Sequence, residues 1–200
     1  MSSKLRKKTT KNIGFTKNQT KEINKSLAII KARDNLVIRS YKDFIIIGYE
    51  CLHWHFGFGL KRIQRTEKLI NTYLEKAETD KNMNGKALAH FLSEKHEINV
   101  NKISNSLSSN QIMKLYFKNK TPNRIETCEI VRATIFNYMA IILTILKTAF
   151  GFSKKNLDKF VNYFTDLFDT LSRVEQFDLT IPMIVKSLAD ETKYVCDYTG

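Results

Sequence analysis

The residues best suited to chemistry lie in and beside one short stretch, HWHFGFGLKRI at positions 53–63. Thiol and imidazole side chains are the usual protein ligands of zinc, and five of them occur in this half of the chain: Cys51, His53, His55, His90 and His96. Their spacing contains neither a Cys-x-x-Cys nor a His-x-x-x-His pair, which structural zinc sites commonly use. We therefore expect packed or surface histidines, with no metal and no cofactor.

The same stretch has some features of a phosphate-binding loop, because it holds two glycines and two cations. A Walker loop needs Gly-x-x-x-x-Gly-Lys-Ser/Thr, and Phe-Gly-Phe-Gly-Leu-Lys-Arg does not supply that pattern. The chain also lacks the Gly-x-Ser-x-Gly elbow of α/β-hydrolases, and its carboxylates are scattered among lysines. These observations favour a protein that is not an enzyme.

Cations follow the Phe-Gly-Phe stretch at the expected start of a helix, where the positive end of the helix dipole disfavours them by a few tenths to about 1 kcal/mol each. Lys61, Arg62 and Arg65 have this position, and Lys154 and Lys155 repeat it after a second Phe-Gly-Phe. An unfavourable arrangement that occurs twice suggests an anion at each helix start, where free N–H groups converge. The alternative is that long side chains simply extend into solvent.

The net charge of +13 lies mainly in two segments. Residues 1–41 carry 11 Lys or Arg against 2 Asp or Glu, residues 101–135 carry 6 against 2, and the remainder is neutral in sum. This asymmetry indicates a polyanionic partner, most often nucleic acid, although a composition bias toward lysine at solvated positions would give the same counts. The candidate contacts in the arm are Lys4, Arg6, Lys7, Lys8 and Lys11.

A second indication of nucleic-acid binding is that residues 86–123 loosely resemble a repressor-type helix-turn-helix. Their second helix is expected to have its N-cap at Ser109 or Asn110 and to end near Asn119. The glycine-containing tight turn of the motif is missing, and an ordinary three-helix core gives the same pattern. In the helix-turn-helix interpretation, the residues that face the groove are Ser109, Asn110, Gln111, Lys114 and Lys118.

The chain contains an internal repeat with an offset of 94 residues. Phe56-Gly57-Phe58 falls on Phe150-Gly151-Phe152, and an apolar stretch precedes each while helix-spaced apolar residues follow each. With the offset grown to 96, residues 83–97 fall on residues 179–193, as in a tandem duplication with one short insertion. Each Phe-Gly-Phe predicts a corner between two helices, with a positive φ at glycine and both phenylalanines in the core. The expected N-caps are Gly59, Asn84, Ser153 and Thr180.

The composition predicts an all-α fold. Seven glycines and two prolines are too few to punctuate a many-stranded sheet, and 42% hydrophobic residues argue against global disorder. We expect two related helix-turn-helix-loop-helix units, at 42–100 and 136–200. A basic helical segment at 101–135 joins them, and a basic arm at 1–41, flexible and then helical, precedes them. The apolar run from Tyr138 to Phe152 is shorter than the roughly 20 residues that a membrane span needs and predicts a core helix.

LHWHFGFGLKRI, at 52–63, resembles a motif of short helical proteins encoded by phages and prophages of Gram-positive bacteria: Leu-His-x-x-Phe-Gly-Phe-Gly-Lys-Lys-Arg-Leu. ALAHFLSEKHEI resembles the short helix that follows in those proteins. The resemblance covers residues 42–100 and, more faintly, 136–197. It implies an accessory protein of a mobile element and no particular activity. In the second copy Ser153 replaces the second glycine, Asn156 replaces the arginine, and the histidine is lost.

Together these features predict a cytoplasmic accessory protein, in a bacterial host cell, that binds DNA or RNA through phosphate contacts of its arm and helix starts. The alternative is a protein-binding factor, such as an inhibitor of a host defence complex, with the acidic, aromatic-rich stretch Phe160–Phe177 as its contact face. Three widely spaced cysteines suit a reducing compartment, and the basic N-terminus lacks the apolar core of a signal peptide. No membrane association is expected.

Overall fold

A computed structural model describes residues 17–117, 122–196 and 198 of the chain, and within those ranges it contains helices and no strand. The predicted all-α class is therefore confirmed. The helices are α1 (Lys17–Phe56), α2 (Leu60–Thr79), a 3₁₀ turn η1 (Lys81–Met83), α3 (Gly85–His96), α4 (Val100–Ser106), α5 (Ser109–Tyr116), α6 (Arg124–Thr148), α7 (Lys154–Ser172), α8 (Val174–Phe177) and α9 (Ile181–Thr192).

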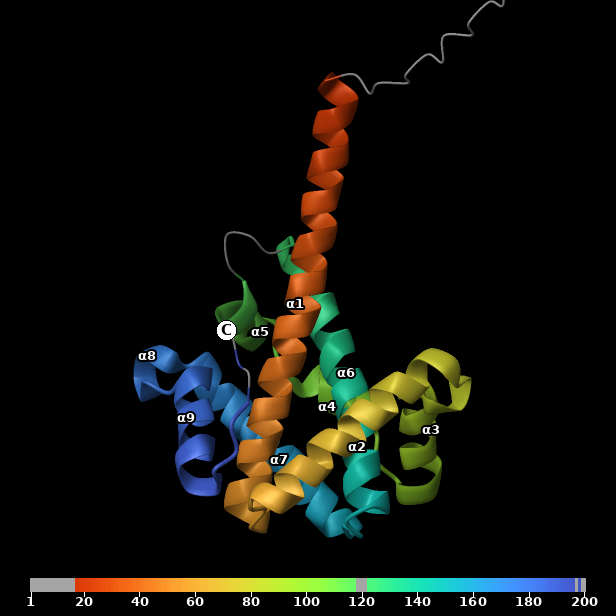
Figure 1. Ribbon diagram of the computed structural model, residues 1–200, viewed down its shortest axis with the longest axis vertical. Helices are drawn as coiled ribbons and strands as arrows, with labels where there is room; N and C mark the ends of the chain where they lie inside the picture. Colours follow the sequence, from red (N-terminus) through yellow and green to blue (C-terminus); the bar gives the residue numbers. More distant parts are fainter. Residues whose placement is uncertain (1–16, 118–121, 197, 199–200) are drawn as a thin grey trace, which may run out of the picture.

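Helix α1 is the axis of the molecule, and only its second half lies in the body (Figure 1). Helix α6 packs along that second half in the same direction. It begins beside the middle of α1, where Arg33 forms an ion pair with Glu126. The two helices end at the same end of the molecule, where Phe56 contacts Phe152. Residues 21–35 of α1 contain no buried side chain among those described, and we call them the projecting segment.

The two predicted units exchange their later helices. Helix α3 of the first unit packs against α6 of the second, and α9 of the second packs against α1 of the first. Helices α2 and α7 likewise contact α6 and α1, respectively. All the buried apolar side chains consequently form a single cluster, so neither unit has a core of its own.

The first helix of each predicted unit crosses a segment boundary that the sequence predicts. Helix α1 runs through the boundary at 41/42, and α6 runs through the boundary at 135/136. The second helix of the helix-turn-helix interpretation is shorter than predicted and begins differently. Its N-cap is Ser108, because Ser108 and Gln111 form a reciprocal capping box, and it ends at Tyr116. The short helix α4, which Asn99 caps, was not expected.

Helix α6 forms the interior of the fold. Among the described residues it is the one helix whose length and composition would allow it to cross a membrane, and 67% of its most apolar window is buried inside the protein. A core helix has the same properties, and α6 contacts six other helices: α1, α2, α3, α4, α5 and α7. The predicted core helix over the apolar run therefore exists, and it begins earlier, at Arg124.

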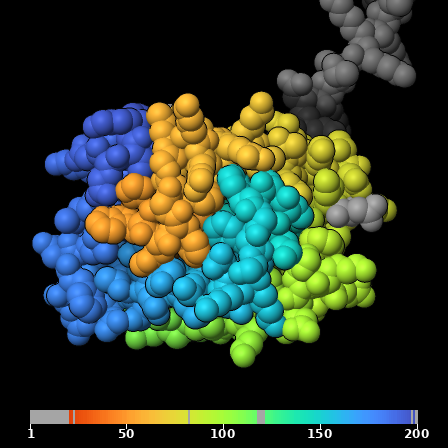
Figure 2. Space-filling view, turned by 90° about the horizontal axis from the view of Figure 1, so that it is seen from below, coloured from red at the N-terminus to blue at the C-terminus, as the bar shows by residue number. Residues whose placement is uncertain are grey.

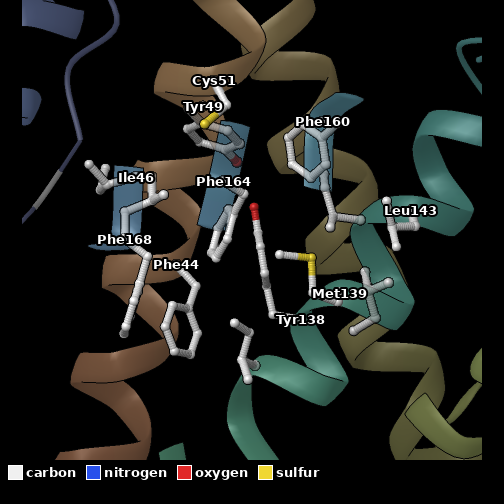
Figure 3. Close-up of a cluster of buried hydrophobic side chains, with 14 of the residues drawn as sticks. Phe44, Ile46, Tyr49, Cys51, Tyr138, Met139, Leu143, Phe160, Phe164 and Phe168 are labelled. Carbon is white, nitrogen blue, oxygen red and sulfur yellow. The ribbon is translucent and has the colours of Figure 1, made fainter. Parts of the chain in front are cut away.

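Helices α1 and α6 approach each other closely at Gly48. Tyr138 of α6 is fully buried there, between Phe44 of α1 and Phe164 of α7, with ring centroids 6.2 and 5.8 Å away (Figure 3). A Cβ at Gly48 would lie 1.8 Å from Tyr138 Oη and 3.1 Å from its Cζ. The hydroxyl itself has no hydrogen-bond partner among the described residues. The packing therefore requires glycine at position 48 and gains nothing from the Tyr138 hydroxyl.

We expect Gly48→Ala to lower the free energy of unfolding by about 2 kcal/mol or more, because the added methyl group overlaps the Tyr138 hydroxyl. Tyr138→Phe alone should be neutral or stabilising, since it removes an unsatisfied buried oxygen. The double variant should recover at least about 1 kcal/mol of the loss. Urea denaturation of the four proteins measures the coupling, and strictly additive changes would contradict a direct contact between positions 48 and 138.

Candidate nucleic-acid interface

Each Phe-Gly-Phe stretch forms the predicted corner between two helices. Gly57 and Gly151 have φ of +64° and +68°. In both corners the amide of the second phenylalanine donates to a carbonyl six residues back, from Phe58 to Leu52 and from Phe152 to Leu146, each at 3.0 Å. Each bond caps the C-terminal end of its helix at a glycine with positive φ. The predicted role of the two glycines is confirmed.

The two corners pack against each other and exchange partners. The ring of Phe56 lies 4.9 Å from that of Phe152, and the ring of Phe58 lies 5.0 Å from that of Phe150. Since Phe56 and Phe150 are equivalent in the repeat, as are Phe58 and Phe152, the contacts are those of a local two-fold arrangement. Only the second phenylalanine of each corner is buried. The expectation that all four would be in the core is therefore wrong for Phe56 and Phe150, which are half-buried.

A polar side chain at the same position of each repeat stabilises each corner. His53 Nδ1 lies 3.0 Å from the carbonyl oxygen of Phe58, and Lys147 Nζ donates to the carbonyl of Phe152 over 3.3 Å. Lys147 is 94 residues after His53. The second ring nitrogen of His53 lies 3.0 Å from Glu191 Oε2, on α9. The histidine thus has a structural role that a lysine fills in the second copy.

Both contacts of His53 are acceptors, so both ring nitrogens must carry a proton to satisfy them. Burial alone would lower the pKa of His53, but hydrogen bonds to Glu191 and to the Phe58 carbonyl outweigh it and raise the pKa above 6.5. The same hydrogen bond lowers the pKa of Glu191. The link between α1 and α9 is therefore strongest when His53 is charged.

The five possible zinc ligands are engaged separately. Cys51 is buried, and burial raises the pKa of its thiol. The ring of His55 stacks on Tyr163 at 3.5 Å, His90 lies 3.3 Å from Glu94, and His96 packs against a phenylalanine. Within the described ranges no three or more His, Cys, Asp or Glu side chains are arranged to hold a metal ion.

The predicted cations after the corners come together at one end of the molecule, because the corners themselves meet there. Figure 2 shows this face, with the segments around residues 50–65 and 145–155 side by side. All five side chains are exposed: Lys61, Arg62, Arg65, Lys154 and Lys155. We call this surface the corner face.

Three of the five cations make contacts within the protein. The guanidinium groups of Arg62 and Arg65 lie over the rings of Phe58 and Phe150, at 5.5 and 5.0 Å. Arg65 also donates to the carbonyl of Ala149, at the C-terminal end of α6. That end of the helix dipole attracts a cation. Arg65 itself lies in the second turn of α2, so the predicted place at the helix start is wrong for this residue. Lys154 pairs with Glu97 at 2.6 Å.

The repeat points to one basic residue of the corner face that the sequence analysis missed. Lys159 is exposed on α7 and falls on Arg65 at the offset of 94. Lys61 falls on Lys155 in the same way. The face therefore carries two equivalent pairs of exposed cations: Lys61 and Lys155 in the first turns of α2 and α7, and Arg65 and Lys159 in the second turns.

A second exposed basic surface lies on the projecting segment. Lys21 and Lys25 are four residues apart and share one side of the helix, and Lys31 is exposed further along. The predicted arm contacts precede this segment and lie outside the described residues: Lys4, Arg6, Lys7, Lys8 and Lys11.

The residues named for a helix-turn-helix are partly engaged in the body. The Gln111 side chain donates to Asp169 of α7 at 2.6 Å, and Arg132 donates to the Ser109 hydroxyl at 3.0 Å. Asn110 and Lys114 are exposed, and Lys118 lies outside the described residues. Two of the residues predicted to face a DNA groove, Ser109 and Gln111, therefore form hydrogen bonds within the protein.

Comparison with protein-family models, with curated proteins and with solved structures gives no match. The function is therefore argued from the chain's own surfaces.

The His53–Glu191 link should make stability depend on pH. Because the folded-state pKa of His53 is raised, its contribution is complete below the unfolded value of about 6.5 and is lost as pH rises through the folded value. We expect Glu191→Gln to lower stability more at roughly pH 5.5 than at roughly pH 9, and to lower the pKa of His53 in an NMR titration. His55, whose pKa burial lowers, is the internal control.

A matched variant separates charge from geometry. His53→Lys should keep a donor on the Phe58 carbonyl, as Lys147 does in the other corner, and should abolish this pH dependence. An unchanged pH profile in His53→Lys would show that another group titrates.

Proposed function

We propose that this protein is a non-enzymatic nucleic-acid-binding protein that contacts phosphates through the projecting segment and the arm before it. One observation carries the proposal: exposed lysines stand on a helix that extends away from the body (Figure 1). The first 16 residues add five Lys or Arg and no Asp or Glu. A cationic helix that is free of the body on several sides can approach a polyanion without a collision.

The corner face supplies a second set of phosphate contacts in this proposal. Lys61, Lys155 and Lys159 are exposed beside the N-terminal ends of α2 and α7, and the amides and dipoles of helix starts favour anions. Lys61 and Lys155 form one equivalent pair, and Arg65 and Lys159 form another. Two such pairs suit the backbone of a duplex, which presents phosphates on two strands. Arg62 and Arg65, whose guanidinium groups lie over phenylalanine rings, are also exposed residues.

The proposal includes a biological setting. A resemblance of the first corner to phage and prophage proteins supports an accessory role for a mobile element, in the cytoplasm of a bacterial host. The two units also have the same order of helices, a positive φ at equivalent glycines and left-handed caps at Glu97 and Lys193, 96 residues apart. These similarities support an origin by duplication.

Binding should depend steeply on salt, and lysine variants should locate it. The logarithm of affinity for duplex DNA should fall with the logarithm of salt concentration by about 0.9 per phosphate contact. Replacing Lys21, Lys25 and Lys31 by Gln should weaken binding and reduce this slope by up to about 3. Fluorescence anisotropy with duplex DNA, single-stranded DNA and RNA measures both quantities.

A matched control removes the same charge elsewhere. Lys76, Lys81 and Lys86 are exposed on α2, η1 and α3, and replacing them by Gln should leave affinity and slope nearly unchanged. A flat salt response of the wild type, or an equal loss in the control, would refute the proposal.

A second candidate is binding of a host protein, and a hollow between α1 and α7 favours it. The hollow has a volume of about 390 Å³, and Glu50, Trp54, Tyr163 and Asp166 are among its lining residues. The Trp54 side chain is 62% exposed, which is unusual for so large an aromatic ring outside an interface. Two carboxylates beside it suit a basic group of a partner.

The contact face predicted for such a partner needs correction. Phe160, Phe164 and Phe168 of the stretch 160–177 are completely buried, because they face α1 and α6, and only Phe177 is largely exposed. The stretch therefore presents mainly its carboxylates to solvent.

If the second candidate is correct, the wild-type protein should retain a bacterial host protein that Trp54→Ala/Asp166→Lys loses. Phe177→Ala, which removes an exposed aromatic ring away from the hollow, is the control and should retain it. Affinity purification with all three proteins decides, and identical captures would reject the hollow as an interface.

A further inference from the structure

The projecting segment and the turn after it expose five large aliphatic side chains, and four of these lie toward one side of the helix. Leu27, Ile30, Val37 and Ile38 are 52, 50, 43 and 56% exposed. Single exposed aliphatic residues are ordinary, but a row of them along one helix marks a contact surface.

The row has the spacing of a coiled-coil seam. Leu27, Ile30, Asp34, Val37, Tyr41 and Phe44 follow one another at steps of three, four, three, four and three residues, which are the a and d positions of a heptad repeat. A stripe of this width fits one partner helix rather than a broad surface.

The lower part of this seam is already occupied within the protein. Tyr41 and Phe44 pack against Tyr138 of α6, with ring centroids 5.9 and 6.2 Å apart. Helix α6 begins near the Arg33–Glu126 ion pair. Leu27 and Ile30 therefore continue an existing helix–helix contact beyond the start of α6, and Val37 lies one turn past that level toward the body.

We propose that a second copy of this chain covers the exposed part, with its own projecting segment antiparallel to the first. A parallel copy in register would need the space beside Tyr41 that α6 fills, and it would place Asp34 opposite the same aspartate of the other copy. The antiparallel copy ends where α6 begins. It sets Leu27 of each copy against Ile30 of the other.

Two features select a second copy over a lipid surface or the nucleic acid itself. Asp34 lies within the seam, where acyl chains would leave its carboxylate unsolvated, whereas coiled coils tolerate an isolated polar residue that sets orientation. Lys21 and Lys25 lie on another side of the helix, about 120° or more from both Leu27 and Ile30 at roughly 100° per residue, so they stay exposed in the dimer.

The test is the mass of the full-length protein over a concentration series, by sedimentation equilibrium. We expect a monomer–dimer equilibrium that Leu27→Gln/Ile30→Gln weakens at least about tenfold. Ile29→Gln removes an aliphatic side chain that is 43% exposed outside the seam and should leave the equilibrium unchanged. A monomer at every concentration, or equal weakening by Ile29→Gln, would overturn the proposal.

Salt separates this inference from the proposed function. Each copy carries four cations and two carboxylates between Lys21 and Ile38, so screening should strengthen dimerisation, whereas it weakens nucleic-acid binding. The salt dependence therefore tests dimerisation and nucleic-acid binding separately, and either can be refuted without the other.

Cross-linking tests the orientation. In a Cys196→Ser background, mixing Leu27→Cys with Ile30→Cys chains should give a mixed disulfide faster than either chain gives its own, because only the antiparallel pair brings the two positions together. Preferential formation of the Leu27→Cys homodimer would show a parallel pair and contradict the proposed geometry.

Discussion

Helix α6 packs against α1 over the length of the body, and the remaining elements take their places from that contact. Gly48 allows the close approach, and Tyr138 fills the space between the two helices and α7. Because α1 and α6 run in the same direction and end together, the two glycine corners meet. Because α6 is shorter than α1, most of the first half of α1 extends beyond the start of α6.

The corner could be predicted from the sequence because its causes are local. Gly57 and Gly151 are needed for a positive φ wherever the chain turns in this way. The packing of α3 on α6 and of α9 on α1 could not be predicted, since it joins segments that are far apart in the sequence. The same limit applies to Arg65, whose hydrogen-bond partner is a carbonyl of the other unit, 84 positions away in the sequence. Lys159 could have been predicted from the sequence, because it is 94 positions after Arg65.

The cations proposed to contact phosphates lie at the two ends of the long axis. The exposed lysines of α1 lie at one end, and the cations of the corner face lie at the other. Between them, carboxylates such as Glu67, Glu97 and Glu191 are engaged by a tyrosine, a lysine and a histidine. An extended polyanion could contact either end, whereas the hollow beside Trp54 suits a compact, basic partner.

Hydrogen exchange of the full-length protein, with and without nucleic acid, tests nucleic-acid binding by these two surfaces most directly. Without ligand, amides in the second half of α1 and in α6 should exchange slowly, and those of residues 21–35 should exchange fast because they have few tertiary contacts. Added nucleic acid should slow exchange in residues 21–35 and at the first turns of α2 and α7. Protection confined to α5 or to the hollow between α1 and α7, or no protection at all, would contradict it.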